Sequence, residues 1–279
     1  MCGIMAKIVR GTKTNEWLPW YWRKSTFPIL SQPAKTLNDI AGTAFLLHYK
    51  KIPYIVTASH VIEMENPVIA FSRKDRQLVC VSSAYLQQTG LKWIKHPVGF
   101  DLAAIPFHLP LSLVKELDVL SITEDKWTPQ SKIKVGDEVA HLGYPQKGTS
   151  IYRDGSPCIY PQAMPGKIIR LNQSDIIMKT ASAHGASGGP VFLRRENDSP
   201  CLVSIVTEAR MFGKHTRPAE AAYCNETRAL IVSLVKDILE TVEMKKQYNN
   251  RWIGENWLLR RYAFKSIPDK TLSKKCPTA

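Results

Sequence analysis

The sequence lacks long apolar segments and closely spaced cysteines. No stretch approaches the roughly 20 consecutive apolar residues that a membrane-spanning helix needs. The first residues contain no apolar run of signal-peptide length. The six cysteines include no C-x-x-C pair, so the spacing of zinc ribbons and thioredoxin-like sites is missing, and no metal site is expected. These absences favour a cytoplasmic protein with reduced thiols and no membrane partner.

Acidic residues are too few to balance the basic ones, and the formal net charge is +14. The excess lies at the ends of the chain. Residues 1–30 hold five Lys or Arg against one acid, and residues 243–279 hold nine against three. The body is close to balanced, so a nucleic-acid-binding body is not predicted. The ends are interpreted as solvated surface or as docking segments for a regulatory protein partner, through the N-terminal arm or the C-terminal helix.

Regular alternation of strands and helices is also missing. From residue 40 to about residue 210, short apolar runs are separated by Gly, Pro and Asn. This pattern is typical of all-β sandwiches and barrels, and it argues against a parallel α/β sheet. The expected strands lie near residues 44–49, 54–57, 67–71, 78–81, 102–105, 138–142, 167–171, 176–179, 190–193 and 202–206.

The two ends differ from this body. Residues 1–35 contain an aromatic-basic cluster and two prolines, which indicates an irregular arm or a short edge strand whose aromatics cap the core. Residues 227–245 predict a helix of about five turns. The apolar positions that carry this prediction are 230, 231, 234, 235, 238, 239 and 242. A basic, aromatic tail follows.

The strongest local motif is a glycine-rich loop, Gly185-Ala186-Ser187-Gly188-Gly189-Pro190. A serine hydroxyl is a weak nucleophile at neutral pH, so it needs a general base and an acid that orients the base. It also needs backbone N–H donors aimed at the developing oxyanion, and glycines permit the positive φ and close approach that this requires. By itself the motif also fits the nucleophile elbow of an α/β-hydrolase or a structural turn.

Chain order separates these alternatives. An α/β-hydrolase places its acid and its histidine after the serine. The only histidine downstream of Ser187 is His215, in a polar stretch. Upstream, His60 ends the run 55–60, and Asp101 begins the run 101–105. The order His60, Asp101, Ser187, with spacings of 41 and 86 residues, is that of the chymotrypsin arrangement.

With these residues in place, the chain resembles the trypsin-like peptidases, most closely the bacterial HtrA-like branch without a PDZ domain. Five ordered blocks between about residues 40 and 210 carry the resemblance. They are Gly42-Thr43-Ala44-Phe45 with Val56-Thr57-Ala58-Ser59-His60-Val61, Asp101-Leu102-Ala103, Val135-Gly136-Asp137-Glu138-Val139 with Leu142-Gly143-Tyr144-Pro145, Asp175-Ile176-Ile177, and Gly185 to Pro190.

The resemblance implies an all-β fold of two packed six-stranded antiparallel β-barrels, chymotrypsin-like, with a C-terminal α-helix and tail. The implied units are an N-terminal arm (1–35), a first barrel with His60 and Asp101 (36–125), a second barrel with Ser187 (126–225) and a C-terminal helix and basic tail (226–279). The implied activity is that of a serine endopeptidase acting on a protein or peptide substrate without a cofactor.

The resemblance also implies a role for each site residue. His60 is expected to be the general base and acid, Asp101 the orienting acid and Ser187 the nucleophile. The backbone N–H groups of Gly185 and Ser187 are expected to form the oxyanion hole. The substrate pocket is expected to be lined by Ala181, His184, Thr207, Glu208 and Ala209.

Two alanines depart from the pattern of secreted trypsins. Ala186 stands where zymogen-activated members carry an aspartate, so activation by that route is not expected. Ala181 at the pocket floor does not support a preference for Lys or Arg. Glu208 either binds a basic substrate residue or faces solvent.

Two other functions stay open at this point. One is a latent or inactive protease-fold module whose basic, tryptophan-bearing ends recruit a partner. The presence of His60, Asp101 and Ser187 together argues against this interpretation. The other is an esterase, because the same acyl-transfer machinery hydrolyses esters.

Overall fold

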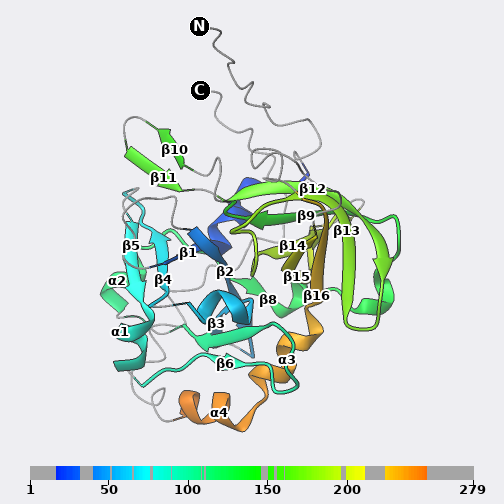
Figure 1. The fold of residues 1–279 in the computed structure, drawn as a ribbon. Coiled ribbons are helices and arrows are strands. Elements are labelled where there is room, and N and C mark those ends of the chain that lie inside the picture. Colours follow the sequence, from blue (N-terminus) through cyan, green and yellow to red (C-terminus); the bar gives the residue numbers. More distant parts are fainter. Residues whose placement is uncertain are drawn as a thin grey trace, which may run out of the picture.

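The computed structural model describes residues 17–31, 40–50, 52–64, 66–75, 78–88, 90–107, 109, 111–145, 150–153, 156–159, 161–195, 199–210 and 224–249. Strands dominate this part of the chain and form two halves that pack side by side, with a few short helices at the periphery (Figure 1). The all-β, chymotrypsin-like class predicted from the short apolar runs is confirmed. No helix among these residues is both long and apolar enough to cross a bilayer.

The first half is an eight-stranded sheet in the order β5-β4-β1-β2-β3-β7-β6, to which β8 adds by parallel pairing with β2. Every residue of β3 is buried, because apolar clusters cover both faces of this strand. The strands are β1 (Thr26–Leu30), β2 (Ile40–Tyr49), β3 (Ile52–Thr57), β4 (Val68–Ser72), β5 (Leu78–Ser82), β6 (Ile94–Lys95), β7 (Ala103–Pro106) and β8 (Ile122–Thr123). The helical turns are η2 (Trp20–Ser25), η3 (Ser59–Ile62), α1 (Ser83–Gln88), α2 (Leu111–Glu116) and η4 (Glu124–Lys126).

The second half is a closed barrel of six strands in the order β12-β13-β16-β15-β14-β9. Its interior is apolar and includes Ile168, Met178, Val191 and Val206. The strands are β9 (Glu138–Gly143), β12 (Gln162–Leu171), β13 (Asp175–Ser182), β14 (Pro190–Leu193), β15 (Cys201–Arg210) and β16 (Cys224–Ile231). A short turn, η5 (Gln130–Lys132), precedes β9, and β10 (Ser150–Arg153) and β11 (Ser156–Ile159) form a separate ribbon.

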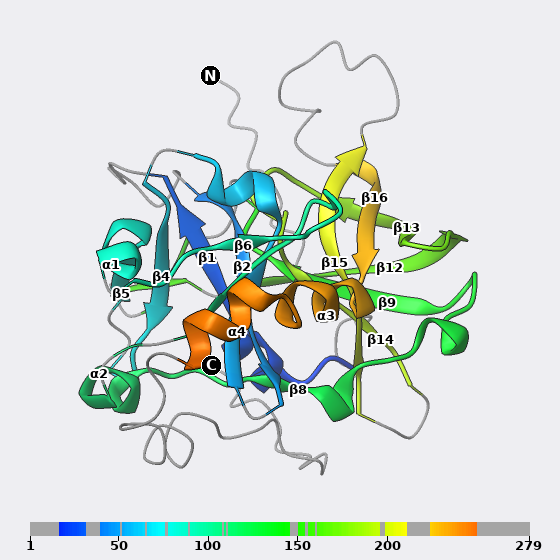
Figure 2. The same ribbon diagram turned by 90° about the horizontal axis from the view of Figure 1, so that it is seen from below.

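One apolar cluster joins the two halves. It combines β2 residues such as Phe45 with Leu142 of β9 and Phe192 of β14. Helix α3 (Ser233–Leu239) contributes to the same cluster, and α4 (Val242–Asn249) follows it. Both helices lie across the first half (Figure 2). Helices α3 and α4 therefore help to hold the two halves together.

The prediction of an irregular arm or edge strand is wrong for residues 20–30. They form η2 and β1, and β1 is an inner strand between β4 and β2. Pro28 is tolerated there because β4 pairs only with Ile29 and Leu30, so the missing N–H of Pro28 costs no hydrogen bond on that side. Trp22 is fully buried, and its ring meets that of Phe192 edge-on at 4.7 Å, as expected for an aromatic that caps the core.

The predicted helix of residues 227–245 begins too early. Residues 224–231 are β16, which pairs with β13 and β15 and closes the barrel beyond the predicted boundary at residue 225. Short apolar runs fit a buried strand as well as a helix, and the open edges of β13 and β15 decide for the strand. The helical part is also divided. Thr241 lies between α3 and α4, and its Oγ1 accepts a hydrogen bond from the N–H of Met244 at 3.2 Å.

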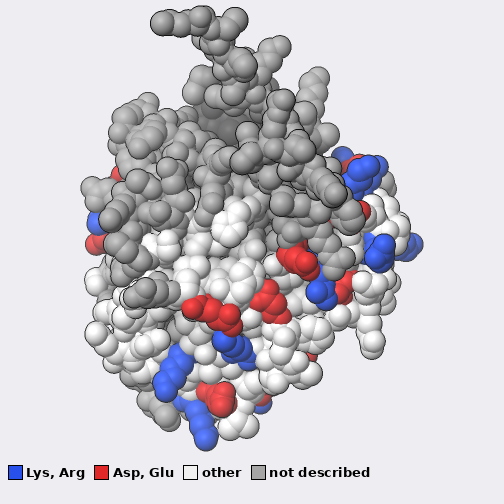
Figure 3. All heavy atoms as spheres, in the orientation of Figure 1, with Lys and Arg blue, Asp and Glu red and all other residues white. Residues whose placement is uncertain are grey.

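Six strands were also predicted for the first half, where the described residues form eight. Two of the eight, β6 and β8, are only two residues long and leave no recognisable pattern in the sequence. On the face drawn in Figure 3, acidic and basic side chains of the described residues are interspersed rather than gathered by sign. The predicted basic termini and the tail after residue 249 lie mostly outside the described residues.

Candidate active site

Strand register brings His60 and Asp101 together. β3 and β7 run antiparallel, and Thr57 at the end of β3 pairs with Ala103 at the start of β7. His60 follows β3 by three residues in η3, and Asp101 precedes β7 by two. Because the two strands are antiparallel neighbours, His60 and Asp101 lie at the same end of the sheet.

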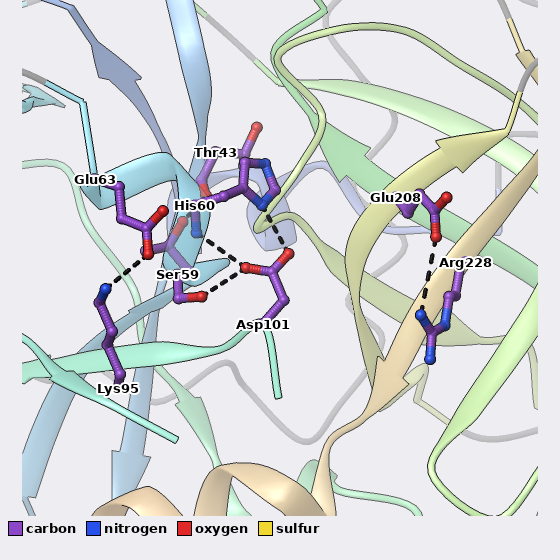
Figure 4. A network of polar contacts seen from close by, with 9 residues as sticks. Thr43, Ser59, His60, Glu63, Lys95, Asp101, Glu208 and Arg228 are labelled. Atoms are coloured by element: carbon purple, nitrogen blue, oxygen red, sulfur yellow. Dashed lines mark hydrogen bonds and ion pairs between the residues drawn. The ribbon is translucent and has the colours of Figure 1, made fainter. Parts of the chain in front are cut away.

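Asp101 accepts three hydrogen bonds from two consecutive residues. One carboxylate oxygen, Oδ2, lies 2.7 Å from Nδ1 of His60. The other, Oδ1, accepts from the backbone N–H of His60 at 2.9 Å and from Oγ of Ser59 at 2.7 Å. Figure 4 shows these contacts converging on the Asp101 carboxylate. Ser59 is a participant that sequence reasoning did not single out, although it lies beside His60 in the same sequence block.

These contacts change the pKa of both groups. The hydrogen bond to Asp101 raises the pKa of His60 above its ordinary value of 6.5, against the opposing effect of burial. Burial by itself raises the pKa of Asp101, but the hydrogen bonds from His60 and Ser59 outweigh it, and the pKa ends below its ordinary value. Asp101 is thus a carboxylate at neutral pH, held against an imidazole that is unusually basic.

Thr43 of β2 ties the Ser187 loop to the first half. Its Oγ1 donates to the carbonyl oxygen of Gly185 at 2.7 Å, and its N–H donates to the carbonyl oxygen of Ser187 at 2.7 Å. Oγ1 also accepts from the N–H of Tyr144 at 3.1 Å. Sequence reasoning quoted Thr43 in a motif but did not assign it this contact, because hydrogen bonds between the two halves leave no pattern in the sequence.

Two glycines in the loop are required by geometry. Gly185 has φ +97° and Gly188 has φ +87°, a region that other residues rarely adopt. A Cβ on Gly188 would lie 2.0 Å from the carbonyl oxygen of Thr43 and 3.0 Å from the backbone nitrogen of Ala58. The loop therefore packs backbone to backbone against the end of β3, two residues before His60. The other side of the loop is held by β15, because Gly188 donates to the carbonyl oxygen of Val206 at 2.7 Å.

Two backbone N–H groups in this loop have no acceptor among the described residues. Among the residues that the structure describes, neither the N–H of Gly185 nor that of Ser187 donates a hydrogen bond within the chain. Their neighbours do donate, since the N–H of Ala186 bonds to Ala183 at 3.1 Å and that of Gly189 bonds to Ala186 at 3.0 Å. The two free donors are the pair predicted for the oxyanion hole.

Comparison with known families decides the classification. A family model described as the trypsin-like peptidase domain matches residues 42–198, more than half of the 279 residues. The chain belongs to the trypsin-like peptidase family. The match includes His60, Asp101 and Ser187, and it ends before β15, β16 and the two C-terminal helices.

No curated protein matches this trypsin-like peptidase. Solved structures similar to it have low sequence identity. The HtrA-type protease AlgW with a tripeptide is 15% identical with a TM-score of 0.49, and AlgW with a decapeptide is 16% identical with a TM-score of 0.47. The alignments cover 79% and 81% of this chain, which spans only 60% and 64% of those chains. Deg5 is 14% identical with a TM-score of 0.46, covering 77% of this chain and 86% of its own.

The predicted pocket residues of this trypsin-like peptidase lie on two segments of the second half, at the end of β13 and in β15. Ala181 is the residue before the last one of β13, His184 follows in the loop, and both are exposed. Thr207 is buried in β15, next to the residue that holds the Ser187 loop. Glu208 is exposed and lies 3.9 Å from Arg228 of β16 (Figure 4), and the side chain of Ala209 is outside the described residues. Their role in substrate binding stays a prediction. Among the described residues, no group of three or more His, Cys, Asp or Glu is placed to hold a metal ion.

His141 is a buried polar residue that sequence reasoning missed. His141 of β9 is the register partner of Val191 on the adjacent strand β14, and the side chain of Val191 lies in the barrel core. Its Nε2 lies 3.2 Å from the carbonyl oxygen of Ala181, the predicted pocket floor. Burial lowers the pKa of His141 to about 4, so the ring is neutral at physiological pH and donates from Nε2 to Ala181.

His141 is expected to make the protein sensitive to acid. Unfolding restores the ordinary pKa of 6.5, so the unfolded chain binds an extra proton once the pH falls below that value. The stability that neutral His141 contributes is complete above pH 6.5, and about 3 kcal/mol of it is lost by pH 4. His141→Gln replaces the ring N–H donor with an amide N–H donor that does not titrate, so the loss of stability between pH 6.5 and pH 4 should disappear. Urea unfolding at pH 7 and pH 4 measures the difference, with exposed His184→Gln as the control. Equal pH dependence in His141→Gln and wild type would contradict the prediction.

Proposed function

We propose that this trypsin-like peptidase is a serine endopeptidase that cleaves peptide bonds in protein or peptide substrates through an acyl-enzyme at Ser187. The observation that carries the proposal is the junction of the two halves. Thr43 holds the Ser187 loop against the end of β3, and the hydrogen-bonded pair of His60 and Asp101 begins just beyond that end. The family match supports peptide-bond hydrolysis as the reaction.

The proposed reaction uses His60 as a proton carrier. Its Nδ1–H donates to the Asp101 carboxylate, which leaves the lone pair of Nε2 for the Ser187 hydroxyl. Ser187 Oγ attacks the substrate carbonyl carbon while its proton passes to Nε2. That proton then goes to the leaving amine as the C–N bond breaks, and water repeats the sequence on the ester. No cofactor enters any step.

The oxyanion is assigned to the free N–H groups of Gly185 and Ser187. Charge on the substrate oxygen develops only in the transition state, so donors already fixed by the loop stabilise it without reorganisation. The positive φ of Gly185 and the Thr43 bonds to the carbonyl groups of Gly185 and Ser187 fix the loop backbone. Removing one oxyanion donor in such sites costs about 10²- to 10³-fold in kcat.

The pH dependence of activity is expected to follow His60. The base must be neutral to accept a proton, so kcat/KM should fall as the pH drops through the pKa of His60, with a midpoint above 6.5. Initial rates on one peptide and one ester substrate, from pH 5 to pH 9, measure the midpoint. A flat profile, or a midpoint well below 6.5, would count against His60 as the base.

Active-site labelling tests the proposal directly. A fluorophosphonate reacts with a serine only when that serine is activated, and the adduct can be located by peptide mapping. The folded protein is expected to take one label, on Ser187, and heat-denatured protein is expected to take none. A folded wild type that remains unlabelled would sink the proposal and favour a binding module.

A cytoplasmic location is part of the proposal. The two cysteine side chains that the structure describes in full, Cys80 and Cys201, are free thiols. Free thiols are the rule in reducing compartments, whereas proteins of oxidising compartments commonly carry disulfides. Localisation of the tagged full chain tests this part independently of activity.

A further inference from the structure

The turn that presents Asp101 has a buried histidine at its base. His96 follows β6 and is 4% exposed. Its N–H donates to the carbonyl oxygen of Leu102 at 2.9 Å, and its carbonyl oxygen accepts from the N–H of Gly99 at 3.0 Å. These two backbone hydrogen bonds close the turn of residues 96–102, which contains Asp101.

The His96 ring holds the same turn from inside. Nδ1 accepts a hydrogen bond from the N–H of Val98 at 3.2 Å. The ring packs edge-on against Phe100, the residue before Asp101, with centroids 4.9 Å apart and planes at 84°. The His96 side chain thus contacts the turn at two positions, Val98 and Phe100.

The other edge of the ring faces helix α3. Because Nδ1 accepts a hydrogen bond, the ring proton of neutral His96 lies on Nε2. Nε2 lies 3.4 Å from Oδ2 of Asp237 without forming a hydrogen bond to it, so the contact between the ring and the carboxylate is electrostatic. The Asp237 side chain is 57% exposed, whereas that of His96 is 1% exposed.

Both C-terminal helices pack on the hairpin of β6 and β7 that carries Asp101. Their apolar residues share a cluster with those of the hairpin, and Figure 2 shows α3 and α4 beside β6. Gln247 of α4 adds a polar contact, since its Oε1 accepts from the N–H of Lys92 at 2.8 Å. The residues of the hairpin and of the two helices that belong to this cluster are Ile94, Leu102, Ala104, Val235, Ile238, Leu239 and Met244.

We infer that His96 is a positioning residue for Asp101, and that it couples helix α3 to the geometry of the His60–Asp101 pair. Among the described residues, no hydrogen bond, ion pair or ring contact joins His96 to His60 or to the Ser187 loop, so His96 acts through the turn. The inference rests on the proposed function in that Asp101 orients the base. It assigns part of that task to α3, which lies beyond residue 198, where the family match ends.

Four variants divide the contacts of His96. His96→Ala removes all three ring contacts, which are those with Val98, Phe100 and Asp237. His96→Asn keeps an acceptor near the Nδ1 position, and His96→Gln keeps a donor near the Nε2 position. Asp237→Asn removes only the charge on α3. Val98→Ala is the matched control, because this side chain is on the same turn and 79% exposed.

The expected result is a loss in kcat with KM unchanged within about twofold. A displacement of about 1 Å far from the reacting atoms can cost about 10²-fold, which is the loss expected for His96→Ala. His96→Asn should recover most of it by restoring the bond to Val98. Val98→Ala should behave as wild type.

A second readout separates positioning from a loss of folded protein. The pKa of His60 is measured by NMR titration in the same variants, each carrying Ser187→Ala to prevent self-cleavage. His96→Ala should lower this pKa toward its ordinary value, because the hydrogen bond to Asp101 is the main cause of the raised pKa. A purely structural role would lower the melting temperature and leave both kcat per folded molecule and the His60 pKa unchanged, which would overturn the inference.

The two proposals fail in different ways. If wild type hydrolyses peptides and folded His96→Ala matches it in kcat and His60 pKa, the positioning role is wrong and the protease stands. If wild type is inactive but His96→Ala still lowers the His60 pKa, the positioning role stands and the protease is wrong. Should His96→Ala not fold, Asp237→Asn decides, because its exposed side chain leaves the core intact. An unchanged His60 pKa in that variant overturns the coupling to α3, and a lowered pKa supports it.

Discussion

Ser187→Ala is expected to lower kcat by about 10⁶-fold, the loss seen when the nucleophile of such a triad is removed. The methyl group cannot attack a carbonyl carbon, so no acyl-enzyme forms. The fold should survive, because Thr43 holds this loop through the carbonyl groups of Gly185 and Ser187 and not through the serine side chain. The measurement is kcat on a fluorogenic peptide, with melting temperature as the check on folding.

A matched serine tests whether this loss is specific. Ser121→Ala removes a buried hydroxyl that has no hydrogen-bond partner among the described residues, next to β8. It should keep wild-type kcat. The double variant Ser187→Ala/His60→Ala should be no slower than Ser187→Ala alone within about tenfold, because residues that act as one unit are not additive. Ser187→Ala activity within tenfold of wild type would refute the assignment of the nucleophile.

Asp101→Asn is expected to lower kcat at neutral pH by about 10⁴-fold while the geometry stays nearly intact. The asparagine carbonyl can still accept from Ser59 Oγ and from the N–H of His60, as Oδ1 of Asp101 does. Its amide group then faces Nδ1 of His60 and donates to it. The ring must carry its proton on Nε2, where it can no longer accept the proton of Ser187.

The pH profile distinguishes this effect from simple loss of structure. Losing the hydrogen bond to Asp101 removes the main cause of the raised pKa of His60, so the midpoint of the remaining activity should move to lower pH. Asp118→Asn is the control, because its half-exposed carboxylate pairs with Lys24 at 2.8 Å and not with a histidine. An Asp101→Asn enzyme within tenfold of wild type, with the same midpoint, would remove Asp101 from the mechanism.

Much of the second barrel was predictable from local sequence. The runs 138–142, 176–179, 190–193 and 202–206 all lie within strands, because short β-branched runs between turn residues can bury their side chains only in sheets. Residues 227–231 were misassigned because a short run such as Ala229-Leu230-Ile231 fits one turn of a helix as well as it fits a buried strand. The open edges of β13 and β15, which β16 fills, are not visible in the sequence.

The candidate site was predictable to a different degree for each residue. His60, Asp101 and Ser187 could be proposed from their order and from the blocks around them. Thr43 and Ser59 could not be given a role, because each acts through a hydrogen bond to a residue that lies far away along the chain. His96 forms its hydrogen bonds within its own turn, but its contact with Asp237 of α3 joins segments that are distant in the sequence. The one feature of the sequence that pointed to Ser59 was its position directly before His60.

The sequence by itself determined the fold class, the order of the site residues and the need for glycine at residues 185 and 188, because these depend on local composition and on backbone freedom. Only the tertiary structure decided that His60 and Asp101 meet, through the pairing of Thr57 with Ala103, and that Thr43 holds the Ser187 loop. It also placed α3 behind the turn of Asp101. The physical reason is that strand register and the packing of the two halves are set by contacts between distant segments, each too weak to leave a pattern in the sequence.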